Sequence, residues 1–274
     1  MEKIRKALDL AREQRAVHHH GQIPDPSPVG EQRRPQGGEV VAYEYTRTRV
    51  ITPDPVALER RRIMLPSSTS AAAEAFRMLR TQILQRMAAH GWRSLAVVSP
   101  GGDEGRSTTA ANLALTIAAD SRHSALLCDL DLRSPSLAAL FDFVAERGVD
   151  DVLAGRSLIE DCLYHPRGYD RFVLLPARAP LAGSSEVLAG PAARELVREL
   201  RERYLDRILI FDLPPVLAAD DALAFAPSVE CALVVVGEGT TRRDDLARCL
   251  ELLRNTPIVG TVLNRAAGVR RSAL

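Results

Sequence analysis

From Ser94 onward, short continuous runs of apolar residues alternate with longer stretches in which apolar residues recur at helical spacing. Apolar runs of this kind are typical of parallel strands that are buried on both faces. Their alternation with helices predicts an α/β fold, one doubly wound domain around a mostly parallel sheet, in which ligands bind beyond the carboxyl ends of the strands. The predicted strands are 95–99, 125–129, 172–176, 208–212, 232–236 and 258–264, and the predicted helices between them include 107–119, 192–204 and 244–255.

A further helix is predicted over residues 70–89, ahead of the first of these strands. Gly91 is suited to end it, because glycine readily adopts the left-handed conformation found just after helices. Between residues 41 and 65 the pattern is ambiguous, since it alternates as in a strand up to residue 51 and then indicates a turn into a short helix. The apolar positions of the helix are Ala73, Phe76, Leu79/Arg80, Ile83 and Met87.

The first 40 residues lack the pattern of a packed domain. Residues 1–16 predict a short amphipathic helix, and the proline-rich and glycine-rich residues 17–40 predict a flexible linker. Three histidines at 18–20 are a weak candidate for metal binding, because no carboxylate or cysteine accompanies them. The expected organisation continues with a lead-in segment over 41–69, a nucleotide-binding domain over 70–268 and a short tail without tyrosines over 269–274.

Composition narrows the possible functions. The chain has 274 residues, of which 46% are hydrophobic and 26% charged, values that are ordinary for a soluble globular protein. Its 36 Lys and Arg residues against 35 Asp and Glu give no basic surplus, so no nucleic-acid partner is expected. The charged N-terminus does not resemble a signal peptide, and no apolar run approaches the roughly 18–20 residues of a membrane span. These features predict a cytoplasmic protein that reaches the inner face of the cell membrane through a partner.

The first predicted strand is followed by a glycine-rich segment, residues 99–114. A turn of this type between a strand and a helix lets backbone N–H groups surround a phosphate at the helix N-terminus. The hydroxyl of Ser107 or Thr108 would be available to Mg²⁺. The literal P-loop pattern fails at two positions, because Pro100 stands in place of the first glycine and Arg106 in place of the lysine.

Carboxylates follow two other predicted strands. Asp129 and Asp131 come at the end of one buried strand, on the same side of the pleat, and Arg133 follows in the same phase. Helix capping can account for one of these two carboxylates but does not readily account for both, which favours a metal or another cation nearby. Asp212 ends a third apolar strand and has the form of a Walker B carboxylate that holds Mg²⁺.

Taken in order, these segments resemble the Walker A, Walker A′ and Walker B motifs of the bacterial tyrosine kinases of polysaccharide export, which belong to the deviant-Walker P-loop ATPases. Upstream, Glu74, Arg77 and Arg80 match the E-x-x-R-x-x-R helix of that family, which builds a ring by docking on a neighbouring subunit. A solvated charged face is the alternative interpretation of this helix. The resemblance extends over residues 70–266 and includes the segments 184–191, 220–227 and 260–266.

The resemblance implies an ATP-dependent and Mg²⁺-dependent tyrosine autokinase that acts with a membrane chain-length (polysaccharide co-polymerase) protein and forms a homo-oligomeric ring. Asp129, Asp131, Arg133 and Arg106 would be catalytic, and Ser107, Asp129 and Asp212 would hold Mg²⁺. Asn264 lies where relatives contact adenine. The nucleotide-binding residues implied are Gly102, Asp103, Glu104, Gly105, Arg106, Ser107, Thr108 and Asn264.

Two departures from the family pattern leave alternatives open. Arg106 replaces a lysine that it does not mimic conservatively, and none of the five tyrosines lies in the tail, where the family carries a cluster of them. Tyr43 and Tyr45 are accessible candidates for phosphorylation, although packing of a short strand would explain them equally well. A catalytically impaired pseudokinase scaffold is therefore a second hypothesis. A partition or positioning ATPase is a third, disfavoured because residues 99–102 lack that class's additional lysine.

Overall fold

The computed structural model describes residues 48–204 and 206–266. The predicted N-terminal helix, the linker with its three histidines, the predicted tail, and Tyr43 and Tyr45 all lie outside the described residues. No described helix is long and apolar enough to cross a membrane.

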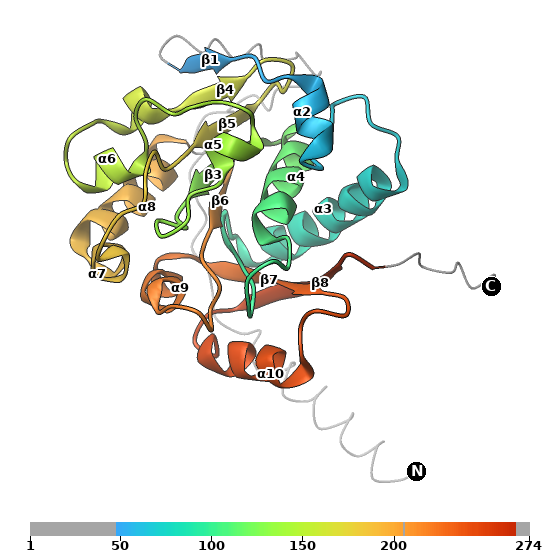
Figure 1. The fold of residues 1–274 in the computed structure, drawn as a ribbon, viewed down its shortest axis with the longest axis vertical. Coiled ribbons are helices and arrows are strands. Elements are labelled where there is room, and N and C mark those ends of the chain that lie inside the picture. The colour runs from blue at the N-terminus through green and yellow to red at the C-terminus, as the bar shows by residue number, and fades with distance from the viewer. Residues whose placement is uncertain (1–47, 205, 267–274) are drawn as a thin grey trace, which may run out of the picture. The chain divides into compact units, whose positions relative to one another are not determined.

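Within the described residues, eight strands form a single sheet in the order β1-β4-β5-β3-β6-β2-β7-β8 (Figure 1). Neighbouring strands are parallel except for β4 and β5, which are antiparallel. The fold is therefore the predicted doubly wound α/β type with a mostly parallel sheet. The strands are β1 (Arg49–Ile51), β2 (Ser94–Val98), β3 (Ser124–Asp129), β4 (Tyr164–Pro166), β5 (Phe172–Leu175), β6 (Arg207–Asp212), β7 (Cys231–Gly237) and β8 (Ile258–Asn264).

Helices cover both faces of this sheet. The predicted helix over 70–89 is α3, which begins after Ser70, whose hydroxyl accepts the N–H of Ala73, and ends at Gly91 with a φ of 70°. The helices are α2 (Pro55–Arg60), α3 (Ala71–His90), α4 (Arg106–Ala118), α5 (Leu137–Leu140), α6 (Val149–Leu153), α7 (Ser184–Ala189), α8 (Pro191–Arg203), α9 (Asp221–Phe225) and α10 (Arg243–Leu252), with 3₁₀ turns η1 (Ile159–Cys162) and η2 (Ala226–Ser228).

Alternate residues of each central strand enter two separate cores. In β2, Ala96 and Val98 pack with α6, α7, α8, α9 and α10, whereas Leu95 and Val97 pack with α2, α3, α4 and α5. Side chains of a strand point alternately to the two faces of a sheet, so continuous apolar runs are required when both faces are covered. Burying one such Val or Leu contributes about 1.5–3 kcal/mol.

The direction of β1 and β4 determines at which edge of the sheet the described domain begins. β4 is antiparallel to β5, and β1 is parallel to β4, so both run opposite to the other strands. The amino ends of β1 and β4 therefore lie at the edge of the sheet where β5, β3, β6, β2, β7 and β8 have their carboxyl ends. Residues 49–60, within the predicted lead-in segment, contribute β1 and α2 to the domain.

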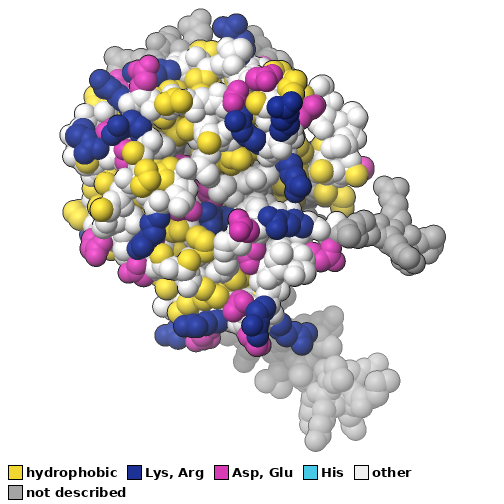
Figure 2. Space-filling view, in the orientation of Figure 1, with side chains coloured by type: hydrophobic (Ala, Val, Ile, Leu, Met, Phe, Trp, Pro, Cys, Tyr) yellow, Lys and Arg dark blue, Asp and Glu magenta, His cyan; other side chains and the backbone are white. Residues whose placement is uncertain are grey.

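Acidic and basic side chains are intermixed on the face that Figure 2 shows. Neither sign of charge forms a continuous field over this face, and apolar side chains separate the charged groups. This surface therefore presents no single electrostatic attraction for a highly charged polymer.

Candidate functional site

The glycine-rich segment forms the turn between β2 and α4. Gly105 directly precedes α4 and has a left-handed φ of 77°, which glycine adopts without the penalty of a Cβ. A Cβ at Gly105 would lie only 2.2 Å from Nδ2 of Asn264, so a larger residue at this position would have to displace that side chain. No side chain caps the start of α4. The first N–H groups of this helix are therefore suited to bind an anion, and Ser107 and Thr108 are the second and third residues of its first turn.

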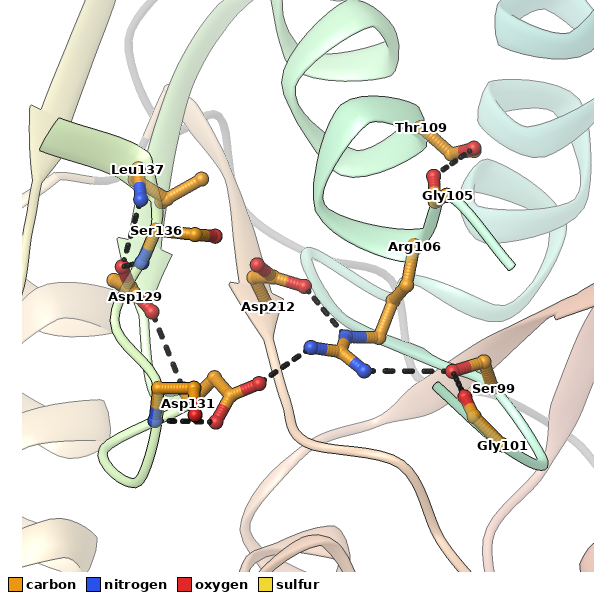
Figure 3. Close-up of polar contacts among 11 residues, drawn as sticks. Ser99, Gly101, Gly105, Arg106, Thr109, Asp129, Asp131, Ser136, Leu137 and Asp212 are labelled. Atoms are coloured by element: carbon orange, nitrogen blue, oxygen red, sulfur yellow. Dashed lines mark hydrogen bonds and ion pairs between the residues drawn. The ribbon is translucent and has the colours of Figure 1, made fainter. Parts of the chain in front are cut away.

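Arg106, the first residue of α4, lies between carboxylates that follow two neighbouring strands (Figure 3). Its Nε donates to Oδ1 of Asp212 at 3.0 Å, and its Nη2 donates to Oδ2 of Asp131 at 2.5 Å. Nη1 donates to the hydroxyl of Ser99 at 3.4 Å. Arg106 is 9% exposed, Asp131 5% and Asp212 0%. Removing one partner of a buried ion pair costs about 3–5 kcal/mol, because it leaves the other charge buried and unpaired.

Asp129 is held by backbone groups and not by Arg106. Its Oδ2 accepts the N–H groups of Ser136 at 2.9 Å and Leu137 at 3.0 Å, at the start of α5, and its Oδ1 accepts the N–H of Asp131 at 3.2 Å. Burial raises the pKa of Asp129 to about 8, and the charge of Asp212 adds to this effect. Asp129 is therefore the carboxylate that binds the first amides of a helix, as in helix capping. Asp131 instead pairs with the cationic side chain of Arg106.

Asp212 is fully buried and has one oxygen, Oδ2, without a hydrogen-bond partner among the described residues. Burial raises the pKa of Asp212, whereas the charge of Arg106 and the hydroxyl of Ser107 act against that shift. Such an unpaired buried oxygen is costly unless a ligand completes it. It is the observation in this structure that indicates where a further cation would bind.

Oxygen donors at this position fit Mg²⁺. This ion commonly takes one or two protein carboxylates and completes its octahedron with a hydroxyl, water and substrate phosphates. The described residues contain no group of three or more Asp, Glu, His or Cys side chains arranged as a protein-only metal cage. Asp212 with Ser107 would hold the ion together with phosphate oxygens, and the ion would neutralise phosphate charge.

Glu104 fastens the glycine-rich turn to β7 and β8. Its Oε2 accepts the N–H of Gly101 at 3.0 Å, and its Oε1 accepts the hydroxyl of Thr241. The carbonyl of Glu104 accepts Nδ2 of Asn264 at 2.8 Å. Asn264 thus contacts the turn itself, whereas Gly102 and Asp103 are exposed at its tip. Thr241 is a site residue that sequence reasoning missed, because no motif marks it and it lies 137 positions from Glu104.

A cleft of about 290 Å³ opens beside this turn, between it and the loop from β7 to α10. Backbone and polar side chains form much of its wall, which suits a polar ligand that extends from the turn. The lining residues are Pro100, Gly101, Gly102, Glu104, Leu217, Ala218, Thr240, Thr241 and Asp245.

Arg133 connects three segments that resemble family motifs. Its Nε donates to Oδ2 of Asp221 at 2.8 Å, and its Nη2 lies 3.7 Å from Oδ1 of Asp220. The hydroxyl of Ser184 donates to Asp221, and that of Ser185 donates to Asp220 at 2.7 Å. The guanidinium is thus paired with Asp221 of α9 and with Asp220 just before it, and not with Asp131 or Asp212. The catalytic role expected of Arg133 stays a prediction.

Known proteins are similar in sequence to this chain. The tyrosine-protein kinase YwqD of Bacillus subtilis is 29% identical over 209 residues, which are 76% of this chain and 86% of YwqD. The succinoglycan biosynthesis transport protein ExoP of Rhizobium meliloti is 32% identical over 215 residues, which are 74% of this chain but 26% of ExoP. No model of a known protein family matches the chain.

The chain belongs to the bacterial tyrosine kinase family. Its relatives in this family include proteins of polysaccharide biosynthesis, as the name of ExoP states. Solved structures agree with this assignment. The chimerical protein CapA2B2 matches with a TM-score of 0.68 and 25% identity over 80% of this chain and 93% of that one. The kinase domain of Escherichia coli tyrosine kinase ETK matches with a TM-score of 0.65 and 26% identity over 75% of this chain and 82% of that one.

The same fold occurs in P-loop ATPases outside the family. The septum site-determining protein MinD of Pyrococcus horikoshii, solved as a complex with Mg-ADP, has a TM-score of 0.54 and 24% identity over 65% of this chain and 72% of that one. This likeness concerns the fold alone.

The helix that matches the family's E-x-x-R-x-x-R motif is α3. Nη1 of Arg77 donates to the carbonyl of Ser68 at 3.4 Å, and Nη1 of Arg80 donates to the carbonyl of Thr116 at 3.2 Å. Among the described residues, neither arginine forms an ion pair with Glu74, which is exposed. The three side chains therefore do not form the charged pairs within the helix that a purely solvated face would favour.

Proposed function

We propose that this chain binds Mg·ATP and transfers its γ-phosphoryl group to tyrosine, as an autokinase that regulates exopolysaccharide or capsule polymerisation and export. The observation that carries the proposal is the meeting of Arg106, Asp131 and Asp212 at the uncapped start of α4. Membership of the bacterial tyrosine kinase family supports the reaction class. The polysaccharide role rests on relatives such as ExoP.

Each side chain has a role that follows from its chemistry. The first N–H groups of α4 and the guanidinium of Arg106 bind phosphate oxygens, while Asp212 and the Ser107 hydroxyl hold Mg²⁺. Asp129 and Asp131 orient the tyrosine hydroxyl and accept its proton. Positioning and charge supply most of the acceleration in phosphoryl transfer.

A pseudokinase scaffold is the second candidate, and the contacts of Arg106 favour it. The guanidinium already donates to both Asp131 and Asp212, which leaves fewer of its N–H groups for phosphate. Against the pseudokinase, the sequence contains only two lysines, Lys3 and Lys6, so arginine at position 106 reflects the preference of the whole chain for arginine over lysine. The replacement alone therefore does not decide between kinase and pseudokinase.

The deciding experiment compares wild type, Arg106→Lys, Arg106→Ala and the exposed control Arg122→Lys. Mg·ATP binding is measured by calorimetry, and transfer is measured by mass spectrometry of phosphotyrosine. A kinase predicts phosphotyrosine in wild type and a loss of about 100-fold in Arg106→Ala, the scale of one lost charge-stabilising group. Binding without transfer in wild type, with transfer restored by Arg106→Lys, would establish the pseudokinase.

We also propose a membrane chain-length protein as partner and a ring of identical subunits. A cleft of about 400 Å³ beside α3 supports the ring, because Arg77 and Arg80 line it together with the end of α4 and the turn from β4 to β5. The chimerical CapA2B2 structure and the span of ExoP beyond the matched region support a membrane partner. Loss of the higher oligomer in Glu74→Ala/Arg77→Ala, measured by light scattering, tests the ring. Nucleotide-dependent dimers alone would indicate a positioning ATPase.

A further inference from the structure

The buried serines of this structure use their hydroxyls within the chain. Each of the five buried serines of the described residues donates a hydrogen bond to a carboxylate or to a carbonyl oxygen. This pattern is expected, because a polar group that is removed from water without a partner is unfavourable. The five are Ser94, Ser99, Ser124, Ser184 and Ser185.

The hydroxyl of Ser136 is different. The residue is half-buried, but its Oγ is shielded from solvent and has no hydrogen-bond partner among the described residues. Ser136 directly precedes α5, where a serine hydroxyl commonly accepts an N–H group of the helix, and it makes no such bond. The carboxylate of Asp129 instead accepts the N–H groups of Ser136 and Leu137. Asp129 therefore fixes the backbone of Ser136, while the Ser136 hydroxyl takes no part in the helix start.

Ser136 lies close to Asp212. Asp129 and Asp212 are register partners on the adjacent strands β3 and β6, and neighbouring strands are about 4.8 Å apart. The N–H of Leu130 also donates to the carbonyl of Asp212 at 2.8 Å. The backbone N of Ser136 is 2.9 Å from Oδ2 of Asp129. Figure 3 shows the Ser136 hydroxyl pointing away from Asp129 and toward the side chain of Asp212.

Asp212 contributes a second unpaired atom next to this hydroxyl. Five buried side-chain nitrogen or oxygen atoms of the described residues have no hydrogen-bond partner, and Oγ of Ser136 and Oδ2 of Asp212 are two of them. An ionised carboxylate only accepts hydrogen bonds, whereas a hydroxyl both donates and accepts. A hydrated Mg²⁺ satisfies both atoms, because the ion binds carboxylate oxygen and its waters donate hydrogen bonds. Mg²⁺ in proteins usually keeps several of its waters.

We infer that Ser136 is a positioning residue of the Mg²⁺ site, whose hydroxyl accepts a hydrogen bond from a water bound to the ion beside Asp212. The inference rests on the proposed binding of Mg²⁺ and nucleotide, and it adds a residue from the start of α5 to Asp212 and Ser107. Groups that orient the ligands of a metal commonly change its affinity by roughly 10–100-fold. A neutral hydroxyl that holds one water belongs at the lower end of this range.

The test compares wild type with Ser136→Ala and with the matched control Ser94→Ala, whose hydroxyl is paired with Glu230 at the opposite edge of the sheet. Calorimetry measures the affinity for ADP in excess Mg²⁺ and again in EDTA, and the ratio of the two affinities reports the contribution of the metal. We expect this ratio to fall about tenfold in Ser136→Ala and to stay unchanged in Ser94→Ala. The affinity for ADP in EDTA stays the same in all three proteins.

Urea unfolding of the nucleotide-free chain separates this role from a structural one. Ser94→Ala removes a hydroxyl that is hydrogen-bonded within the chain, so it lowers the midpoint of unfolding. Ser136→Ala removes an unpaired hydroxyl and leaves the midpoint unchanged or raises it.

The possible failures are distinguishable. If Mg²⁺ strengthens ADP binding by the same factor in Ser136→Ala as in wild type, or if Ser136→Ala lowers the unfolding midpoint as far as Ser94→Ala does, the inference is wrong and the proposed nucleotide site stands. An equal loss of ADP affinity with and without Mg²⁺ also overturns it, because the hydroxyl would then contact the nucleotide. ADP binding in wild type that is absent, or that Mg²⁺ does not strengthen, rejects the proposed site and the inference together.

Discussion

Two carboxylates at opposite edges of the same sheet, the half-buried Glu230 and the buried Asp212, differ in whether both of their oxygens are hydrogen-bonded. Glu230, just before β7, has both oxygens satisfied: Oε2 accepts the N–H groups of Arg93 and Ser94 and the Ser94 hydroxyl, and Oε1 accepts Arg201. Asp212, at the end of β6, has an oxygen without a partner among the described residues. The comparison separates a carboxylate whose two oxygens are both hydrogen-bonded within the chain from one with an oxygen that has no hydrogen-bond partner among the described residues.

The pKa directions agree with this difference. Burial would raise the pKa of Glu230, but the N–H groups of Arg93 and Ser94, the Ser94 hydroxyl and Arg201 lower it below its ordinary value. Burial dominates at Asp212 and raises its pKa although Arg106 and Ser107 oppose the shift. Hydrogen bonds to the charged form outweigh burial at one edge of the sheet and do not at the other.

The largest expected effect comes from exchanging each carboxylate for its amide. Asp212→Asn lowers Mg·ATP affinity or transfer by about 100-fold, because a metal ligand is lost where no other group replaces it. Glu230→Gln leaves Mg·ATP affinity unchanged and lowers the free energy of unfolding by about 1–3 kcal/mol, because its donors lose their charged acceptor. Calorimetry and denaturant unfolding measure the two quantities. Equal effects of the two variants on binding would remove the distinction.

The second prediction concerns the pH dependence of stability in the nucleotide-free protein. The pKa of Asp129 rises from 3.8 to about 8 on folding, so its stabilising contribution is complete below pH 4 and is lost as pH rises toward 8. The free energy of unfolding falls by up to about 1.4 kcal/mol per pH unit for this one proton. Denaturant unfolding between pH 5 and 8 should show a flatter slope in Asp129→Asn than in wild type.

Glu230 provides the control with the opposite sign. Its pKa is lowered from 4.5 on folding, so its contribution is present above that value and is lost as pH falls through the lower folded pKa. Glu230→Gln therefore changes the profile only on the acid side. A flatter slope of the unfolding free energy against pH, between pH 5 and 8, in Glu230→Gln would contradict the assignment of that slope to Asp129.

The smallest effects come from two glycines with left-handed conformation at opposite edges of the sheet. Gly168, in the turn between β4 and β5, has a φ of 90° and open space where a Cβ would lie, whereas a Cβ at Gly105 meets Asn264 at 2.2 Å. Gly168→Ala costs about 1–2 kcal/mol of stability for its conformation alone. Gly105→Ala adds displacement of Asn264 and weakens Mg·ATP binding several-fold. Equal binding by both variants would show that the contact with Asn264 is dispensable.

The central sheet could be predicted because its strands are long apolar runs buried on both faces, as in β3 and β6. β4 could not, since three residues that include His165 and Pro166 carry no strand pattern. The helices α5, α6, α7 and α9 span four to six residues, too few for a helical period to emerge.

The candidate site, like the fold, could be predicted from the sequence only in part. Asp129, Asp131 and Asp212 could be placed together because parallel strands end at one edge. The partners of Arg106 and Arg133 could not, because a long side chain selects among several acceptors only after the elements have packed. The contact of Glu104 with Thr241 depends on the adjacency of β2 and β7, which follows from the strand order and from no local pattern.

The reversed direction of β1 also determines where tags and labels can be attached to the protein. The described domain starts and finishes at one edge, since β1 enters there and β8, parallel to β7, leaves there beside the glycine-rich turn. An affinity tag or fusion partner joined directly before residue 48 or after residue 266 would therefore emerge at the edge that carries the proposed nucleotide site. Loops at the opposite edge, such as the turn from α10 to β8 around the exposed Asn255, line neither the cleft beside the glycine-rich turn nor the cleft beside α3, and they are the sites for attaching a fluorophore or a surface anchor.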